Sequence, residues 1–312
     1  MNLSVVIPAY NEADNIKATV EELLKVIGRI SDIGDVKVVV VDDHSSDNTY
    51  DIVRNMKDPR VMCLRLSRRS GSHAALRAGF IESNSDFVMC LSADGQDDPN
   101  CLKQMLLKLR SGCNVVWALR KNRNKESLIL QLFAKTFYKT LLKLTGSDQS
   151  GIDLSRADFY MLDRSVLEAI KSCTERNTSL FGLISWLGFK QEFVEYERRE
   201  RNSGLSKWSF RSRFRLARDW IVAFSGLPLK LMSLVGFFVA LSGFLYALYV
   251  IFNAFSGNPI DGWSSIMVAV LILGGIQMIM LGVVGEYLWR NLDESRERPL
   301  YFIEKKTQKN HE

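Results

Sequence analysis

The C-terminal third of the chain constrains its architecture most. Two long apolar stretches, at about residues 231–252 and 266–288, follow a region of mixed polarity. Each stretch is long enough to cross a hydrocarbon core of about 30 Å. A buried helical hairpin in a large soluble protein is the alternative. It is disfavoured because neither stretch carries a charge before Glu286, and core helices of soluble proteins are usually shorter. We therefore predict two transmembrane helices within residues 231–290.

The charges around these stretches predict an orientation. The connecting residues 253–265 include Asp261 and contain no Lys or Arg, whereas both outer flanks are basic. The basic flanking residues are Arg211, Arg213, Arg215, Arg218, Lys230, Arg290, Arg296, Arg298, Lys305 and Lys306. Because Lys and Arg stay on the cytoplasmic side, we expect both ends of the chain in the cytoplasm and the connection on the far side. A domain tethered in this way is expected to act on a lipid or on a molecule passed to a lipid.

The composition limits the kinds of binding partner and the cellular compartment that the protein can have. The 312 residues carry a net charge of +6, but the basic residues cluster beside the apolar stretches, so a membrane surface explains the charge better than nucleic acid does. The five cysteines are odd in number and form no CxxC pair, which favours buried thiols in a reducing compartment. Three scattered histidines are too few for a zinc site. Residues 1–9 lack the basic start and apolar core of a secretory signal.

The first two thirds of the chain alternate between strand and helix patterns. Strands are predicted at residues 3–7, 36–41, 61–66, 87–91 and 115–119, and helices at residues 16–27, from 49, from 72 and at 99–110. Asn11 is a candidate cap for the first helix. This alternation predicts a largely parallel sheet with helices on both faces, and ligands bind such sheets beyond the carboxyl ends of the strands.

Two amphipathic segments accompany this domain. Residues 128–144 and residues 209–224 carry apolar side chains on one side and Lys or Arg on the other. Each fits a helix packed on the core or a helix lying in the membrane interface. The predicted organisation is a domain at 1–208, a juxtamembrane amphipathic helix at 209–230, two transmembrane helices at 231–290 and a cytoplasmic tail at 291–312.

Acidic residues follow two of the predicted strands, at residues 42–43 and 94–98. Parallel strands place these two groups at the same edge of the sheet. Carboxylates there can hold a divalent cation that bridges a diphosphate, or they can simply cap the next helix. The loop that contains Asp42 and Asp43 is either a plain turn or an acceptor of hydrogen bonds from a base or ribose.

Three segments near the ends of predicted strands resemble motifs of a known family. Residues 8–12 (PAYNE), 41–45 (VDDHS) and 93–97 (ADGQD) look like the successive nucleotide-sugar motifs of family 2 inverting glycosyltransferases with the GT-A fold. Later segments are similar to polyprenyl-phosphate glycosyltransferases, including the bactoprenol glucosyltransferases of the GtrB type. These segments are residues 157–159, 175–177, 185–188, 197–207 and 285–287. The resemblance implies an α/β fold of the GT-A type, with a Rossmann-like, mostly parallel sheet, followed by amphipathic interfacial helices and a two-helix transmembrane hairpin.

The resemblance also implies a reaction. A hexose, here expected to be glucose from UDP-glucose, moves with inversion to polyprenyl (undecaprenyl) phosphate at the cytoplasmic face of the bacterial inner membrane. The product serves cell-envelope glycan modification, such as that of the lipopolysaccharide O-antigen. Mg²⁺ or Mn²⁺ is the implied cofactor, and a homo-oligomer such as a tetramer is the implied assembly. The alternatives are another donor sugar (GlcNAc, galactose, mannose or an amino sugar) or a non-catalytic membrane scaffold. A processive polysaccharide synthase is disfavoured, because the Gln-x-x-Arg-Trp motif and further spans are absent from the sequence.

The family motifs assign donor and metal residues by position. Asp94 matches the second acid of the Asp-x-Asp metal motif, and the resemblance gives it a catalytic role. Gln96 matches the Gln that follows this motif. Both are candidate metal ligands. Asp43 is expected to contact the nucleoside. The full set of candidate donor-binding residues is Pro8, Tyr10, Glu12, Asp43, Asp94 and Gln96.

The acceptor side is assigned in the same way. Asp158 matches the acid proposed as catalytic base, and Arg198, Arg201 and Lys207 fall where the family places positive charge near phosphate. A phosphate monoester is mostly dianionic at pH 7, so it needs little deprotonation. Its approach to an anionic donor instead needs cations, which suits these three residues.

The chain departs from the family pattern at several positions. Ser92 replaces the first acid of Asp-x-Asp, and Gly95 replaces a bulky apolar residue. His44 stands where Gly is usual, and Tyr160 stands where relatives often have Arg. One carboxylate with diphosphate oxygens and waters still suffices for Mg²⁺, which normally uses one or two protein carboxylates.

Overall fold

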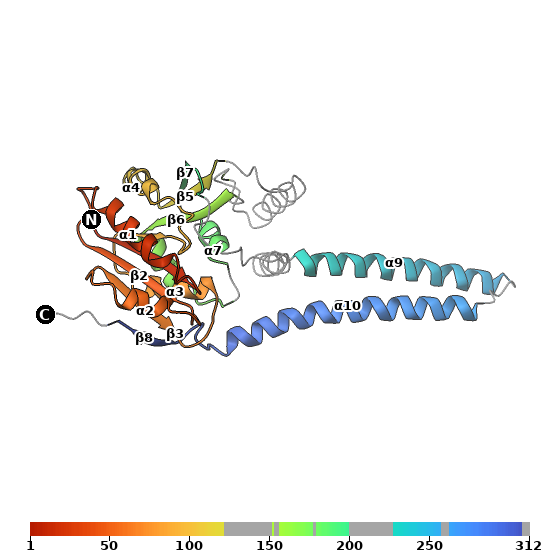
Figure 1. Cartoon of the computed structure of the whole chain (residues 1–312). Helices are drawn as coiled ribbons and strands as arrows, with labels where there is room; N and C mark the ends of the chain where they lie inside the picture. Colours follow the sequence, from red (N-terminus) through yellow and green to blue (C-terminus); the bar gives the residue numbers. More distant parts are fainter. Residues whose placement is uncertain (122–151, 153–155, 177–178, 200–226, 257–261, 308–312) are drawn as a thin grey trace. The chain divides into compact units, whose positions relative to one another are not determined.

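The structure is a computed structural model that describes residues 1–121, 152, 156–176, 179–199, 227–256 and 262–307 (Figure 1). The chain divides into two compact units. One contains Met1–Arg213 together with Pro299–Glu312, and the other contains Phe214–Arg298.

The first unit is built on an eight-stranded sheet with the order β7-β5-β6-β4-β1-β2-β3-β8. The strands are β1 (Leu3–Ala9), β2 (Val36–Asp42), β3 (Val61–Leu66), β4 (Phe87–Cys90), β5 (Val115–Arg120), β6 (Ala157–Asp163), β7 (Gln191–Tyr196) and β8 (Ile303–Lys306). Strands β4, β1, β2 and β3 are parallel, as are β5 and β7. Strand β6 runs antiparallel to β4 and β5, and β8 runs antiparallel to β3. The predicted mostly parallel sheet is confirmed.

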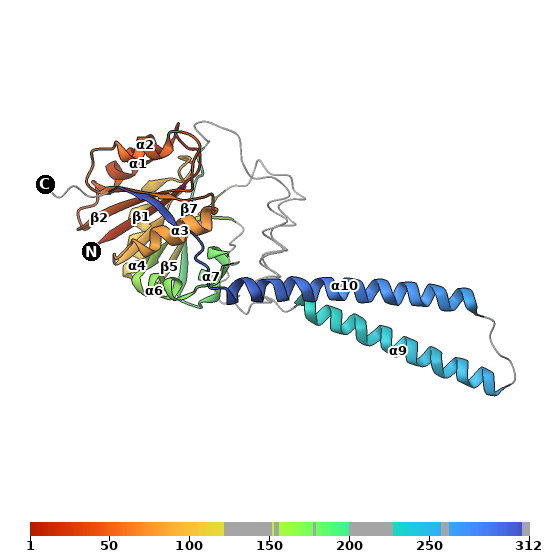
Figure 2. The same ribbon diagram turned by 90° about the horizontal axis from the view of Figure 1, so that it is seen from below.

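Helices cover both faces of this sheet (Figures 1 and 2). They are α1 (Ile16–Ile27), α2 (Thr49–Arg54), α3 (Ser72–Ile81), the 3₁₀ turn η1 (Pro99–Cys101), α4 (Leu102–Arg110), α6 (Arg164–Ser172) and α7 (Leu180–Trp186). Side chains alternate between the faces along a strand. Thus Val5 joins a core cluster with residues of α1, α2 and α4, whereas Val6 faces α3.

Helix α3 lies unusually close to β1. A Cβ atom added to Gly79 would fall 2.2 Å from Cγ1 of Val6, so a larger residue would displace the helix from the strand. Glycine at this position therefore sets the spacing between α3 and β1.

The structure corrects two details of the sequence analysis. Asn11 does not cap α1, because the helix begins after Asn15, and the Asn11 side chain accepts a hydrogen bond from the backbone N–H of Ser46 instead. In addition, the segment expected to be a tail contributes β8, which pairs with the edge strand β3.

The second unit contains two long helices, α9 (Leu227–Phe255) and α10 (Trp263–Ser295). Residues Leu231–Asn253 and Val268–Ser295 are candidate membrane spans with mean hydropathies of 2.2 and 2.3, and most of the large apolar side chains described there are exposed. A Cβ atom at Gly236 would lie 3.0 Å from Cε of Met280, so the helices approach closely there. The amphipathic segments at 128–144 and 209–224 lie outside the described residues.

Candidate active site

The loops that carry the predicted motifs meet at one edge of the sheet. Strands β1, β2, β4, β5 and β7 end there, and β6 begins there because it runs the other way. This reversal brings Asp158, the second residue of β6, to the edge where β4 delivers Asp94 and Gln96. The edge is therefore the place where a parallel sheet of this kind binds its ligand.

The loops after β1 and β2 are tied together by hydrogen bonds. The backbone N–H of Asn11 donates to Oγ of Ser45 at 2.9 Å, and that of Glu12 donates to Oγ1 of Thr49 at 3.0 Å. Asn11 has a φ of 54°, a left-handed conformation that Asn tolerates better than most residues do. Pro8 lies within β1 opposite Val41, just before this loop.

Asp43 is held in place by the start of α3. Its two carboxylate oxygens accept hydrogen bonds from the backbone N–H groups of Ser70 at 2.6 Å and Gly71 at 2.8 Å. Gly71 has a φ of 92°, which favours glycine. Burial raises the pKa of Asp43, and these two hydrogen bonds oppose the rise. Each carboxylate oxygen carries two lone pairs, so each can accept one further hydrogen bond.

Tyr10 carries a cation over its ring. The guanidinium carbon of Arg69 lies 4.1 Å from the ring centroid, within the range of a cation–π interaction. Arg69 also lies near enough to Asp43 to lower its pKa. Arg69 was not among the site residues predicted from the sequence. The available signal was a pair of arginines, Arg68 and Arg69, directly after a predicted strand.

The acidic loop after β4 has an internal hydrogen-bond pattern. Oδ1 of Asp94 accepts from Oγ of Ser92 at 2.8 Å and from the backbone N–H of Gln96 at 3.2 Å. Asp97 accepts from the backbone N–H of Ser92 at 2.8 Å. Asp98 caps η1 by accepting from the backbone N–H of Asn100, so the helix-cap interpretation holds for Asp98. Asp94 instead stabilises the loop.

Asp158 lies at the centre of a charged cluster. Its Oδ2 accepts a hydrogen bond from the Tyr196 hydroxyl at 2.5 Å and lies 3.0 Å from Nε of Arg120. Its Oδ1 lies 3.6 Å from a guanidinium nitrogen of Arg198. The other terminal nitrogen of Arg198 donates to Oε1 of Gln96 at 2.8 Å. The structure thus brings together three of the predicted site residues: Gln96, Asp158 and Arg198.

Burial raises the pKa values of two neighbours of Asp158. Burial raises the pKa of Tyr196, and the charges of Asp97 and Asp158 add to the rise, so the hydroxyl stays protonated and donates. Burial likewise raises the pKa of Asp97 to about 6, and Asp158 and Asp94 contribute smaller effects. Arg120 and Tyr196 were missed by the sequence analysis, because nothing in their local sequence links them to Asp158.

Arg199, which follows Arg198 in the chain, has a different environment from Arg198. Arg199 donates to Glu22 of α1 at 2.6 Å and to Asp98 at 2.8 Å, so its side chain braces the β4 loop against α1. Arg201 and Lys207 lie outside the described residues, and their predicted role stays a prediction.

The side chains of the β4 loop suit a hard cation. Within the described part of the chain, no three Asp, Glu, His or Cys side chains cluster as a metal site. Asp94 and Gln96 offer one carboxylate and one amide oxygen. Mg²⁺ is often bound by one or two carboxylates together with substrate phosphates, so this small set fits a cation that arrives with a diphosphate.

Comparison with known proteins agrees with this architecture. The chain resembles the crystal structure of mannosyl-3-phosphoglycerate synthase from Rubrobacter xylanophilus, with a TM-score of 0.51 at 18% identity over 71% of this chain and 72% of that one. That likeness concerns the fold.

The sequence relatives are closer. The chain is 34% identical to the bactoprenol glucosyl transferase of Shigella phage SfV, over 99% of this chain and 100% of the relative. It is 33% identical to the prophage bactoprenol glucosyl transferase homolog of Escherichia coli (strain K12), over 98% and 99%.

The fold and the site thus define a glycosyltransferase of the GT-A type. Residues 4–170 match glycosyl transferase family 2, and residues 227–290 match the GtrB C-terminal hairpin. The chain belongs to glycosyl transferase family 2.

Proposed function

We propose that the protein transfers a hexose from a nucleoside diphosphate sugar to polyprenyl phosphate. Glucose from UDP-glucose is the donor we favour, because relatives that align over the whole chain are named bactoprenol glucosyl transferases. The product is a lipid-linked sugar for cell-envelope glycan modification.

The contact of Arg198 with both Gln96 and Asp158 carries the proposal. It connects a loop suited to a cation and diphosphate with a carboxylate suited to the acceptor. A phosphate entering this place meets a cation already held between the two. The candidate base lies beside that cation, and the Tyr196 hydroxyl contacts both Asp158 and Asp97 of the β4 loop.

On the donor side, Asp43, Tyr10 and Arg69 form the nucleoside end of the site, with Pro8 and Glu12 beside them. Asp94 and Gln96 would hold Mg²⁺ or Mn²⁺, which when bound neutralises charge on the donor diphosphate. If Gln96 serves as a ligand, its amide oxygen must release its hydrogen bond to Arg198 and bind the metal ion instead.

On the acceptor side, a phosphate oxygen attacks the anomeric carbon from the face opposite the leaving group, and the bond to the nucleoside diphosphate breaks, with inversion. Arg198, together with Arg201 and Lys207, reduces the repulsion between the two anionic substrates. Asp158 accepts the proton of any acceptor that arrives as the monoanion. Tyr196 and Arg120 keep Asp158 oriented for that task.

The membrane side of the proposal rests on α9 and α10. We place both helices across the bacterial inner membrane, with the catalytic domain and both termini on the cytoplasmic face, because the basic residues flank the hairpin on that side. A homo-oligomer such as a tetramer is part of the same proposal.

The test is a transfer assay with the purified full-length protein. Undecaprenyl phosphate, Mg²⁺ and labelled UDP-glucose, UDP-GlcNAc, UDP-galactose and GDP-mannose are supplied one donor at a time, and label in the lipid fraction is measured. We expect label from UDP-glucose. Label from a different sugar would correct the donor. No lipid label from any donor, with a folded protein, would contradict the proposal and favour a scaffold whose metal loop lost its first acid at Ser92.

A further inference from the structure

The strand β8 is fastened to the sheet at both of its ends. The backbone N–H of Ser67 donates to the carbonyl of Phe302 at 2.9 Å, and the backbone N–H of Thr307 donates to the carbonyl of Cys63 at 3.0 Å. Between them, Lys305 pairs with Arg65 of β3 in antiparallel register. A segment that follows the second candidate span thereby becomes the edge of the catalytic sheet.

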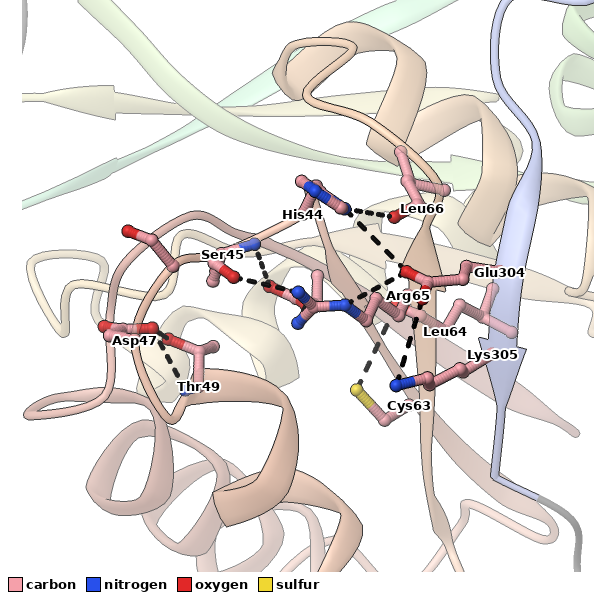
Figure 3. Close-up of polar contacts among 12 residues, drawn as sticks. His44, Ser45, Asp47, Thr49, Cys63, Leu64, Arg65, Leu66, Glu304 and Lys305 are labelled. Carbon is pink, nitrogen blue, oxygen red and sulfur yellow. Dashed lines mark hydrogen bonds and ion pairs between the residues drawn. The ribbon is translucent and has the colours of Figure 1, made fainter.

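Glu304 of this strand faces the loop that follows β2. Figure 3 shows its carboxylate beside the Arg65 guanidinium and the His44 ring, with a dashed line to each. Oε2 of Glu304 accepts from Nε of Arg65 at 3.3 Å and lies 3.8 Å from Nδ1 of His44. The same His44 nitrogen lies 3.1 Å from the carbonyl oxygen of Leu66, so the ring is held between β3 and β8.

Arg65, which contacts Glu304, also contacts residues of the loop after β2. One of its terminal nitrogens donates to Oδ2 of Asp42 at 2.7 Å, and the other donates to the carbonyl of Ser45 at 3.0 Å. The side chain of Asp42 has 0% exposure, and Arg65 is its ion-pair partner. Oδ1 of Asp42 in turn accepts from the backbone N–H of Ser45 at 3.0 Å.

The residues fixed in this way surround Asp43. Asp42 and His44 are its chain neighbours, and Ser45 Oγ accepts the backbone N–H of Asn11 from the loop after β1. His44 has a φ of 57°, a conformation uncommon for a residue with a side chain, and its ring contacts hold it there. The backbone that presents Asp43 to the nucleoside end of the site is therefore supported from β8.

We propose that β8 is a positioning element of the donor site, in which Glu304 acts through Arg65 and His44 on residues 42–45. The affinity for the nucleoside diphosphate sugar then depends on a segment that follows the transmembrane hairpin in sequence. This inference rests on the proposed function for the identity of the ligand, and on the contacts above for the coupling. Glu304 itself touches no substrate.

Two variants of the same strand test the proposal. Glu304→Gln removes the charge that faces Arg65 and His44 while keeping the shape of the side chain. Lys306→Gln is the matched control, because Lys306 pairs with Glu82 at 2.7 Å and contacts no residue of the donor loop in the described structure. Lys306→Gln breaks one ion pair of β8, and Glu304→Gln breaks the contacts of Glu304 with Arg65, His44 and Lys305. Any general weakening of the strand therefore affects both variants.

Donor kinetics are the first measurement, made on the full-length protein with UDP-glucose and undecaprenyl phosphate. In Glu304→Gln we expect the KM for the donor to rise about threefold to tenfold, with kcat and the KM for the lipid unchanged. The rise stays modest because the side chain of Glu304 is 39% exposed and Asp42 keeps its bond to Arg65. Lys306→Gln should keep the wild-type donor KM. Equal donor KM values in the two variants would overturn the proposal.

Amide hydrogen exchange of the substrate-free protein separates this inference from the proposed function. We expect faster exchange across residues 42–46 in Glu304→Gln than in Lys306→Gln or the wild type. Unchanged protection of that segment would overturn the coupling, whatever the substrate is. If the wild type used none of the nucleotide sugars, the proposed function would fail, and faster exchange in Glu304→Gln alone would still support the coupling.

Discussion

The hydroxyl of Tyr196 donates a 2.5 Å hydrogen bond to Oδ2 of Asp158, although the two residues belong to strands that are not neighbours. Strand β5 runs between β7 and β6, and its last residue, Arg120, lies 3.0 Å from the same carboxylate oxygen. Three strand termini thus converge on one acid. The orientation of Asp158 is determined by strand order rather than by its own local sequence.

Tyr196→Phe should therefore reduce turnover without weakening donor binding. A hydrogen bond to a charged group contributes about 1.5–3 kcal/mol, so we expect kcat to fall about tenfold to a hundredfold. Asp158→Asn should cost at least as much, because it removes the negative charge that the Tyr196 hydroxyl, Arg120 and Arg198 contact. The measurement is kcat and donor KM for both variants. A Tyr196→Phe enzyme with normal kcat would show that the hydrogen bond serves stability alone.

The sequence was informative where structure is local. Periodicity located the first five strands, and the family motifs singled out Asp43, Asp94 and Asp158 as candidate site residues. The contacts of Asp158 could not be read in this way, because β6 enters the sheet antiparallel between β4 and β5 and only that insertion brings Tyr196 near. The strand β8 was missed for a different reason. Its sequence, IEKK, has no alternation of apolar and polar residues, and it forms a strand because β3 offers an unpaired edge.

Asp94→Asn should abolish metal-dependent transfer in a protein that remains folded. Asp94 offers a carboxylate in the loop where the diphosphate would enter, and the amide variant can still accept the hydrogen bonds from Ser92 and Gln96. Activity is measured against Mg²⁺ and Mn²⁺ concentration, with a thermal unfolding curve to check the fold. Near-normal activity with an unchanged metal dependence would remove Asp94 from the metal site.

Two adjacent arginines allow a matched comparison on the acceptor side. Arg198→Gln removes the cation that contacts Asp158 and Gln96, whereas Arg199→Gln removes one that pairs with Glu22 and Asp98. We expect the KM for undecaprenyl phosphate to rise about tenfold in Arg198→Gln, because a charge-assisted contact with phosphate is lost. In Arg199→Gln we expect mainly a lower melting temperature. If the lipid KM rises equally in both variants, Arg198 has no special role in acceptor binding.

Acid should destabilise the domain through His73. Desolvation, together with the charge of Arg77, lowers the pKa of His73 to about 4 from its usual 6.5, and its Nδ1 accepts from the backbone N–H of Leu180 at 3.4 Å. Between these two pH values the unfolded chain binds a proton that the folded chain does not, so stability is lost as the pH falls from 6.5 towards 4. The loss at pH 5 should be on the order of 1–2 kcal/mol. Asp97 has the opposite effect in this range, because burial raises its pKa to about 6 and the folded chain then binds the extra proton. The contribution of His73 is therefore measured by comparing the wild type with His73→Gln in melting temperature at pH 7.5 and pH 5. His73→Gln, which cannot titrate, should lose less stability in acid than the wild type, and an identical loss would assign the acid sensitivity to other groups.

Labelling of introduced cysteines tests the membrane topology. Ser256 lies at the end of α9, next to the connection between the two candidate spans, and its side chain is exposed. The connection contains no Lys or Arg, so the positive-inside rule places it outside the cytoplasm. A cysteine at Ser256 should therefore react with an impermeant thiol reagent in intact cells. Ser111→Cys, on the exposed end of α4 in the catalytic domain, is the matched control and should react only after the cells are broken. The native cysteines provide a low background, since four of them are buried and Cys173 is partly so. If the cysteine at residue 256 also required broken cells, the connection would be cytoplasmic, and the proposed orientation of the hairpin would be wrong.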